Sequence, residues 1–442
     1  MEMGLVSVDR WVQGSQAYFL THLHSDHTKG LSSSWSHGLL FCSPTTAKLL
    51  PFKFPDFDLS LLRILHVGTT HTLSLRSPSS SSTTTVFVTA IDACHCPGSV
   101  MLLFRGEFGC VLHTGDFRWE VGCERARMAK QVLRAALGGE DGVDVLYLDN
   151  TYANPTYDFP SRQVAARKVI DLVKSLPDHD VIIGINSLGK EDLLVQIAME
   201  LNIKVCVWPE RLRTMRILGL PDVFTTDTTI TRVRAVPQCS LKIDTLETMN
   251  QRRPTIGILP SGLPWAKKYI QKGEFLSGSF LTSRYKRDKW SENSKDQSDK
   301  PIGNTGPPEQ IHQHMYAVPY SEHSNYFEIE DFIKVVKPTS IKGIVSASEC
   351  YIEPMHFFGR LCRVNQPKQD LHNRSEVKDS GKRVGTVSPE TSLGDDVKLH
   401  RYGSGTSRIK LLGVRKRRLS VLIRKRRGVK IVDIDSPEIV GN

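Results

Sequence analysis

The feature that most constrains this chain is a cluster of metal-binding side chains directly after a short apolar run. The run, residues 17–20, is followed within seven residues by His22, His24, Asp26 and His27. Imidazole and carboxylate bind Zn²⁺ and its first-row neighbours, and a strand end with its turn can direct alternate side chains at two points. The spacing therefore predicts a two-metal site. The alternative is a polar loop that holds three of the fifteen histidines by chance, and residues downstream decide between them.

Residues 1–150 alternate short β-type runs with polar clusters. Strands are predicted at 87–91, 100–104, 111–113 and 143–148. The Ser- and Thr-rich stretch 77–85 predicts a loop between strands. Three of the predicted strands end in polar residues that include His95, Asp116 and Asp149. Enzymes often place working groups on such loops, because the sheet supplies rigidity and the loop supplies access.

From residue 151 onward, strands and helices alternate, which predicts a small parallel α/β domain. The predicted elements are helix 161–176, strand 181–185, helix 191–201, strand 204–208 and strand 255–259. The polar stretch 271–310 predicts a mobile surface insert. Three further elements follow it: strand 315–320, helix 326–336 and strand 341–345. Beyond Cys362 the periodicity is lost, which predicts a disordered tail.

Charge is concentrated in that tail. Residues 363–442 hold 19 Lys and Arg against 9 Asp and Glu, and so carry most of the net charge of +11. Two basic clusters, 415–418 and 424–427, are typical of nuclear import signals, so we expect a nuclear protein. Non-specific phosphate contacts and a merely solvated tail are the alternatives. The chain shows no signal-peptide pattern and no apolar run of 18 residues, which predicts a protein that is neither secreted nor membrane-spanning.

The nine cysteines include no C-x-x-C pair, a usage that is typical of a reducing compartment. Cys94 and Cys96 flank His95 and could serve as soft zinc ligands. On a strand they would point to one side and His95 to the other, so we interpret them as core thiols.

The spacing permits a ligand assignment. The first metal takes His22, His24 and His95, the second takes Asp26, His27 and His323, and Asp116 bridges the two. Two ions about 3.5–4 Å apart clamp a hydroxide and both reacting oxygens of a phosphoester. We expect one or two Zn²⁺ ions, with Mg²⁺ or Mn²⁺ as alternatives at the second position, and hydrolysis of a phosphodiester.

Several motifs resemble those of the metallo-β-lactamase fold and of its nucleic-acid branch, the β-CASP group. The longest matches are similar to the DNA cross-link repair nucleases, above all to their 5′ exonuclease branch, and cover residues 5 to about 350. The matching segments are 22–28, 42–44, 95–101, 114–116, 147–151, 187–191 and 319–324.

This resemblance implies an α/β fold, namely a metallo-β-lactamase αββα sandwich with an inserted β-CASP cap and a DNA-binding cleft between them. The implied boundaries are 1–155 and 311–362 for the sandwich, 156–310 for the cap and 363–442 for the basic tail. It also implies that Asp9 supports the metal ligands and that Asp149 lies near the metals. The implied catalytic residues are Asp26, Asp116, Asp149 and His323.

The implied activity is that of a metal-dependent 5′-to-3′ DNA exonuclease of interstrand cross-link repair, with telomere ends as another place of action. A structure-selective DNA endonuclease of the same family is the alternative. An RNA endonuclease of this fold would be expected to have a histidine at Val345. A thioesterase or lactamase would not need Asp149, His323 or so large an inserted domain, and a DNA-binding scaffold on a dead site would lack some of the ligands.

Two loops without metal ligands predict that the enzyme acts on ends that carry a 5′ phosphate. Ser99 lies four residues after His95, and Ser187 and Lys190 lie between a predicted strand and a helix start. Backbone N–H groups and an ammonium can hold a phosphate there, although residues 189–190 could also merely open the helix. We therefore expect DNA with free 5′ ends as the partner, repair proteins as further partners, no membrane, and a monomer.

Overall fold

The computed structural model describes residues 5–76, 82–138, 142–155, 157–262, 308–345 and 353–365. All of them fall in one compact unit, Met1–Asp370. The expected insert at 271–310 and the expected tail at 363–442 lie almost wholly outside the described residues. In the described part of the chain, no helix combines the length and the apolar character needed to cross a bilayer.

Two β-sheets form the first part of this unit. One is parallel throughout, in the order β1-β2-β3-β4, and the other is mixed, in the order β17-β9-β8-β7-β6-β5. In the mixed sheet β17, β9 and β8 run parallel, whereas β8, β7, β6 and β5 pair antiparallel. The strands are β1 (Val6–Val8), β2 (Ala17–Phe19), β3 (Leu39–Cys42), β4 (Leu62–Ile64), β5 (Thr70–Arg76), β6 (Thr83–Asp92), β7 (Val100–Gly106), β8 (Gly109–His113), β9 (Val145–Leu148) and β17 (Ser340–Gly343).

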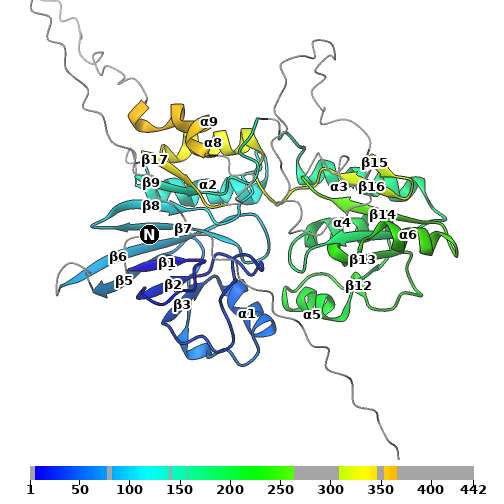
Figure 1. Cartoon of the computed structure of the whole chain (residues 1–442), viewed down its shortest axis with the longest axis horizontal. Coiled ribbons are helices and arrows are strands. Elements are labelled where there is room, and N and C mark those ends of the chain that lie inside the picture. The colour runs from blue at the N-terminus through cyan, green and yellow to red at the C-terminus, as the bar shows by residue number, and fades with distance from the viewer. Residues whose placement is uncertain are drawn as a thin grey trace, which may run out of the picture. The chain divides into compact units, whose positions relative to one another are not determined.

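The two sheets pack face to face, with a helix layer on each outer side (Figure 1). Phe19 and Phe41 of the parallel sheet meet Phe104 of the mixed sheet in the core between them. Helix α1 (Pro44–Lys53) buries Leu50 against the outer face of the parallel sheet. Helices α2 (Glu124–Leu137) and α8 (Tyr326–Val336) bury Leu133 and Phe332 against the mixed sheet. The predicted αββα sandwich is thus confirmed.

A third sheet, of seven strands, lies between β9 and α8 in the sequence, in the order β12-β11-β13-β10-β14-β16-β15. Its pairs are all parallel except β15 with β16. Helices α3 and α4 cover one face through Val169 and Ile197, and α6 covers the other through Leu246. The elements are α3 (Arg162–Ser175), β10 (Asp180–Ile185), α4 (Glu191–Leu201), β11 (Val205–Cys206), α5 (Pro209–Ile217), β12 (Phe224–Thr225), β13 (Val233–Pro237), α6 (Ile243–Asn250), β14 (Thr255–Pro260), β15 (Glu309–His312) and β16 (Met315–Val318).

The predicted helices 191–201 and 326–336 begin and end where α4 and α8 do, because each has an amphipathic face and α8 also has a capping box of Asn325 and Glu328. The predicted loop 77–85 is wrong at its end. Thr83 and Thr85 belong to β6 and pair with β5, since β-branched side chains suit a sheet. Residues 77–81 lie outside the described part.

The sheet to which β16 belongs also bears on where the inserted part of the chain ends. We predicted that the sandwich resumes at residue 311, but β16 pairs with β14 in the seven-stranded sheet. We therefore propose that the inserted part ends after Val318. The chain then passes through residues 319–325 into α8, and this connection carries His323.

Candidate metal centre

Ligand-type side chains from four separate loops meet at one place. The loop after β2 supplies His22, His24, Asp26 and His27. His95 follows β6, Asp116 follows β8 and His323 follows β16. All of these loops follow strand ends, as the sequence predicted, and the sheets give each loop a fixed origin.

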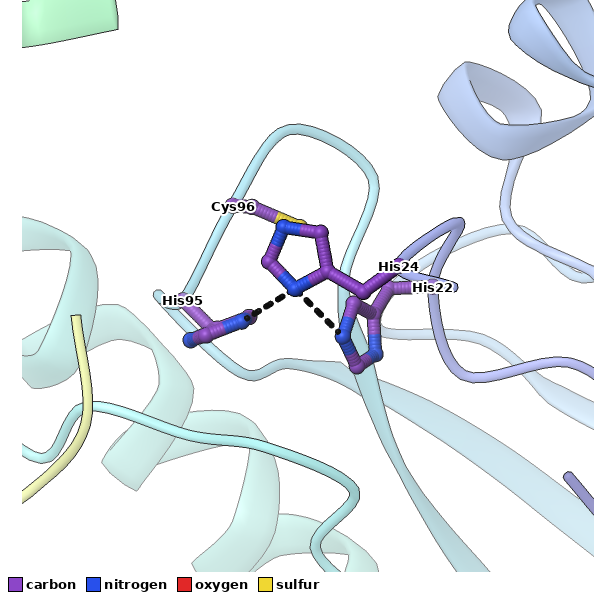
Figure 2. A group of neighbouring side chains, drawn as sticks. All are labelled: His22, His24, His95 and Cys96. Atoms are coloured by element: carbon purple, nitrogen blue, oxygen red, sulfur yellow. Dashed lines mark hydrogen bonds between the residues drawn. The ribbon is translucent and has the colours of Figure 1, made fainter. Parts of the chain in front are cut away.

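Four ligand atoms form a compact group around His24. Its Nδ1 lies 3.0 Å from Nε2 of His22 and 3.1 Å from Nε2 of His95, and the three rings stand nearly perpendicular to one another (Figure 2). Oδ2 of Asp116 lies 3.6 Å from Nε2 of His22 and 3.7 Å from Nε2 of His95. Ligand atoms about 2.0–2.1 Å from a tetrahedral zinc are roughly 3.3 Å apart. These four distances are compatible with ligands of a single metal ion.

A second group shares Asp116. Its other oxygen, Oδ1, lies 3.2 Å from Nε2 of His27, and Oδ2 of Asp26 lies 3.6 Å from the same nitrogen. His323 groups with His95 and Asp116, with all three ligand atoms within 4.8 Å of one another. Asp26 is the exposed member, with 76% of its side chain accessible. Asp116 thus offers one oxygen to each group.

Every histidine of the cluster has a hydrogen-bond partner on the ring nitrogen that does not face the centre. Such partners fix the tautomer and the ring orientation of metal-binding histidines, and their loss typically costs 10–100-fold in metal affinity. The pairs are His22 Nδ1 with Thr21 Oγ1 (3.0 Å), His24 Nε2 with the Leu188 carbonyl (2.9 Å), His27 Nδ1 with Asp9 Oδ2 (2.7 Å), His95 Nδ1 with the Glu322 carbonyl (2.8 Å) and His323 Nδ1 with Asp149 Oδ2 (2.8 Å).

Asp9 connects two of these pairs. It accepts hydrogen bonds from the Thr21 hydroxyl at 2.6 Å and from the Thr21 backbone N–H at 2.9 Å, in addition to that from His27. Because the Thr21 hydroxyl donates to Asp9, it is free to accept from the ring N–H of His22. One carboxylate therefore orients both His22 and His27.

The carboxylates beside His27 and His323 favour a positive charge there, whereas burial disfavours one on His95. Burial lowers the pKa of His95 to about 3, with help from His323. Burial would lower the pKa of His27 as well, but Asp116 and Asp9 raise it to about 12, and Asp149 and Asp116 likewise raise the pKa of buried His323 to about 9. Burial opposes ionisation of Asp116, yet His27 and His323 hold its pKa well below the usual range. A metal ion bound here would displace these protons.

The sulfur of Cys96 groups with ligand atoms of His22, His24 and His95, all within 4.8 Å of one another, so these four side chains could also hold a metal ion (Figure 2). The predicted strand geometry around Cys94 and Cys96 is wrong, because β6 ends at Asp92 and Cys94 has a φ of +55° in the loop that follows. Cys96 packs in an apolar cluster with Leu20 and Leu188. Burial, followed by the nearby Glu322, raises the pKa of its thiol well above the usual value.

The three residues predicted to contact phosphate have different surroundings. Ser99 is buried, and its hydroxyl accepts from the backbone N–H groups of His95 and Cys96. Lys190 is also buried, and its ammonium lies 3.2 Å from Glu322 Oε2. Ser187 is exposed. This geometry does not support direct phosphate contacts by Ser99 and Lys190, because both side chains already have protein partners.

Arg118 is a residue that the sequence reasoning missed, although it stands two positions after Asp116. Its guanidinium is fully buried and donates to the carbonyls of Ser321 at 3.1 Å and His323 at 3.3 Å. It also donates to the Pro160 carbonyl at 3.2 Å and pairs with Glu328 at 2.9 Å. Arg118 therefore holds the segment that carries His323.

The αββα sandwich and this histidine–aspartate cluster define a protein of the metallo-β-lactamase class. More particularly, residues 219–349 match the family model described as DNA repair metallo-beta-lactamase.

Named relatives agree with this assignment. The chain is 39% identical over 345 residues to "5' exonuclease Apollo" of Danio rerio, and the match covers 77% of the chain and 51% of the relative. It is 39% identical over 350 residues to the Gallus gallus protein of the same name, covering 78% and 63%. It is 33% identical over 340 residues to "DNA cross-link repair protein SNM1" of Arabidopsis thaliana, covering 75% and 61%. The chain thus spans between about half and two thirds of these relatives' lengths.

Proposed function

We propose that this protein is a zinc-dependent 5′-to-3′ DNA exonuclease that acts in DNA repair. The observation that carries the proposal is the bridging position of Asp116, one oxygen of which faces His22 and His95 and the other His27. Such a pair of adjacent sites is suited to phosphodiester hydrolysis. The DNA repair family match and the relatives named as a 5′ exonuclease and a cross-link repair protein support DNA as the substrate.

The residues divide between two metal positions. His22, His24, His95 and Asp116 Oδ2 would hold the first ion, and Asp116 Oδ1, His27, Asp26 and His323 would hold the second. Five imidazoles in one cluster favour Zn²⁺ over Mg²⁺, although the carboxylates of the second position also suit Mg²⁺ or Mn²⁺. When bound, the metals supply a nucleophile at neutral pH and neutralise charge on the phosphate.

The protein's own groups then orient the reaction. Asp149 accepts from Nδ1 of His323, which groups with Asp116 and His95 as a possible metal ligand. Asp149 also accepts from the Thr151 N–H at 3.0 Å and hydroxyl at 2.6 Å, so its carboxylate cannot rotate freely. Asp26, as the exposed ligand, lies where a phosphate oxygen could approach from solvent.

The requirement for a 5′ phosphate is part of the proposal. Ser187 is exposed next to Leu188, whose carbonyl contacts His24, so a phosphate at Ser187 would lie near the metals. Because Lys190 is paired with Glu322, Lys190→Ala is expected to slow 5′-phosphorylated and 5′-hydroxyl DNA equally, whereas Ser187→Ala slows the phosphorylated substrate more. A nuclear location is a further part of the proposal, because a DNA repair enzyme needs access to chromosomal DNA.

Digestion of end-labelled DNA tests the function. Full-length protein with Zn²⁺ is expected to shorten linear, 5′-phosphorylated DNA from its 5′ end and to leave a covalently closed circle intact. An Asp116→Asn variant serves as the metal-site control. Cutting of the circle or of hairpin loops would assign the chain to the structure-selective endonucleases, and failure to cut any DNA while an RNA substrate is cleaved would reject DNA as the substrate.

A further inference from the structure

A short loop after β10, residues 187–191, which ends at the first residue of α4, contacts the metal cluster although it contains no predicted metal ligand. The Leu188 carbonyl accepts from Nε2 of His24 at 2.9 Å. This hydrogen bond joins residues 164 positions apart and connects the inserted sheet to the sandwich. The orientation of His24 therefore depends on where this loop lies.

Glu322 holds the same loop from the other side. One carboxylate oxygen accepts the backbone N–H of Lys190 at 2.6 Å, and the other lies 3.2 Å from the Lys190 ammonium. Both side chains are buried, with 7% or less of each exposed. The carbonyl of the same Glu322 accepts from Nδ1 of His95 at 2.8 Å. One ion pair thus connects the acceptors of two metal-site histidines.

The loop is built to keep this carboxylate close. Gly189 has a φ of +102°, and a Cβ at this position would lie 2.5 and 2.6 Å from the two carboxylate oxygens of Glu322. Only glycine allows that approach. On the far side, Arg211 is fully buried, donates to the carbonyls of Ser187 and Gly189, and pairs with Glu191 at 2.8 Å. The loop is therefore fixed on both sides.

We propose that Lys190 and Glu322 are positioning residues, whose buried ion pair aligns the Leu188 and Glu322 carbonyls and thereby sets the metal affinity of His24 and His95. The inference rests on the proposed metal centre. It extends that centre by making its affinity a function of a contact made by the inserted domain. Partners of the outer ring nitrogen typically contribute 10–100-fold to metal affinity, and this pair acts on two histidines at once.

Zinc titration of full-length protein tests the proposal. Lys190→Met and Glu322→Gln are each expected to raise the zinc dissociation constant about 10–100-fold, measured by competition with a chromophoric chelator. Arg167→Met is the matched control, since Arg167 and Glu200 form an exposed ion pair on the same domain, and it should bind zinc like the parent. A folded Lys190→Met protein with parental zinc affinity would overturn the proposal.

A steric pair of variants tests the same contact without removing a charge. Gly189→Ala pushes a methyl group against Glu322 and is expected to weaken zinc binding at least about tenfold. Gly219→Ala is its control, because Gly219 also has a positive φ, of +69°, but a Cβ there meets nothing within 4 Å. Equal zinc affinities of the two variants would contradict the proposed role.

A third experiment uses the protein without substitutions, so a folding defect of a variant cannot affect its result. By reciprocity, zinc binding should slow hydrogen exchange of the peptide that covers residues 187–191, which holds no metal ligand. Unchanged exchange on zinc addition would refute the coupling. Failure of the parent to bind zinc at all would instead reject the metal centre itself, so the two ideas fail separately.

Discussion

Arg118→Met should be among the most destabilising substitutions on the face that carries His323. The change removes the guanidinium from buried Glu328 and from the carbonyls of Ser321, His323 and Pro160. Breaking a buried ion pair by deleting one partner typically costs about 3–5 kcal/mol, because the other charge stays buried. We expect a loss of this size in the free energy of unfolding at pH 8.5.

The loss should shrink at lower pH. Burial raises the pKa of Glu328 from 4.5 to about 7 even though Arg118 opposes the shift. A carboxyl with a raised pKa binds its proton more tightly in the folded state, so this contribution to stability is present at low pH and is lost as pH rises through about 7. Without Arg118 the pKa of Glu328 rises further. At pH 6 the Arg118→Met variant can therefore bury Glu328 as a neutral carboxyl instead of a carboxylate.

Urea titration followed by tryptophan fluorescence measures the effect, since Trp119 packs against Phe332 beside this pair. The double variant Arg118→Met, Glu328→Gln leaves no unpaired charge and should regain most of the loss. Arg127→Met, which breaks an exposed pair with Glu124, should have no measurable effect. A loss below about 1 kcal/mol at pH 8.5, or an equal loss at pH 6 and pH 8.5, would refute the reasoning.

Three further outcomes are expected. Asp9→Asn should weaken zinc binding about 10–100-fold in a chelator competition, because Asp9 orients both His22 and His27; unchanged affinity would remove that role. Asp26→Asn should lower DNA hydrolysis at least about 100-fold with parental thermal unfolding, since this side chain is exposed, while the neighbouring Ser25→Ala stays active; near-parental turnover of Asp26→Asn would exclude Asp26 as a ligand. Deletion of residues 405–442 should leave hydrolysis of short DNA unchanged but reduce nuclear accumulation. A truncated protein that remains wholly nuclear would reject the hypothesis that the two basic clusters are import signals.

The sequence predicts well where the ligand-type side chains lie, because each of their loops follows a strand end. The sequence predicts less well which ligands group together around each of the two metal positions. We predicted Asp26, His27 and His323 around the second metal; the ligand atoms also group His27 with His22 and Asp116, and His323 with His95 and Asp116, so the two positions share residues. Side-chain direction in an irregular turn decides this grouping, and no sequence periodicity encodes it.

Hydrogen-bond partners that lie far apart in the chain are the second feature that the sequence does not predict. The Leu188 carbonyl and the Glu322 carbonyl are backbone atoms, so residue identity carries no signal for their contacts with His24 and His95, which span 164 and 227 positions. The lengths of short strands are also predicted poorly, for a related reason. Strand β11 has only two residues where the apolar run predicted five, because neighbouring strands, and not local pattern, set where pairing stops.

The spread of the ligands along the chain has a consequence for biosynthesis. His22 leaves the ribosome long before His323, and at roughly 5–20 residues per second the interval between them is on the order of 15–60 s. During that time the nascent chain lacks His323, the Glu322 carbonyl that orients His95, and the carboxylate that fixes the Lys190 loop. A chain that stops short of residue 323 therefore has an incomplete metal site, so a prematurely terminated product should be inactive toward DNA.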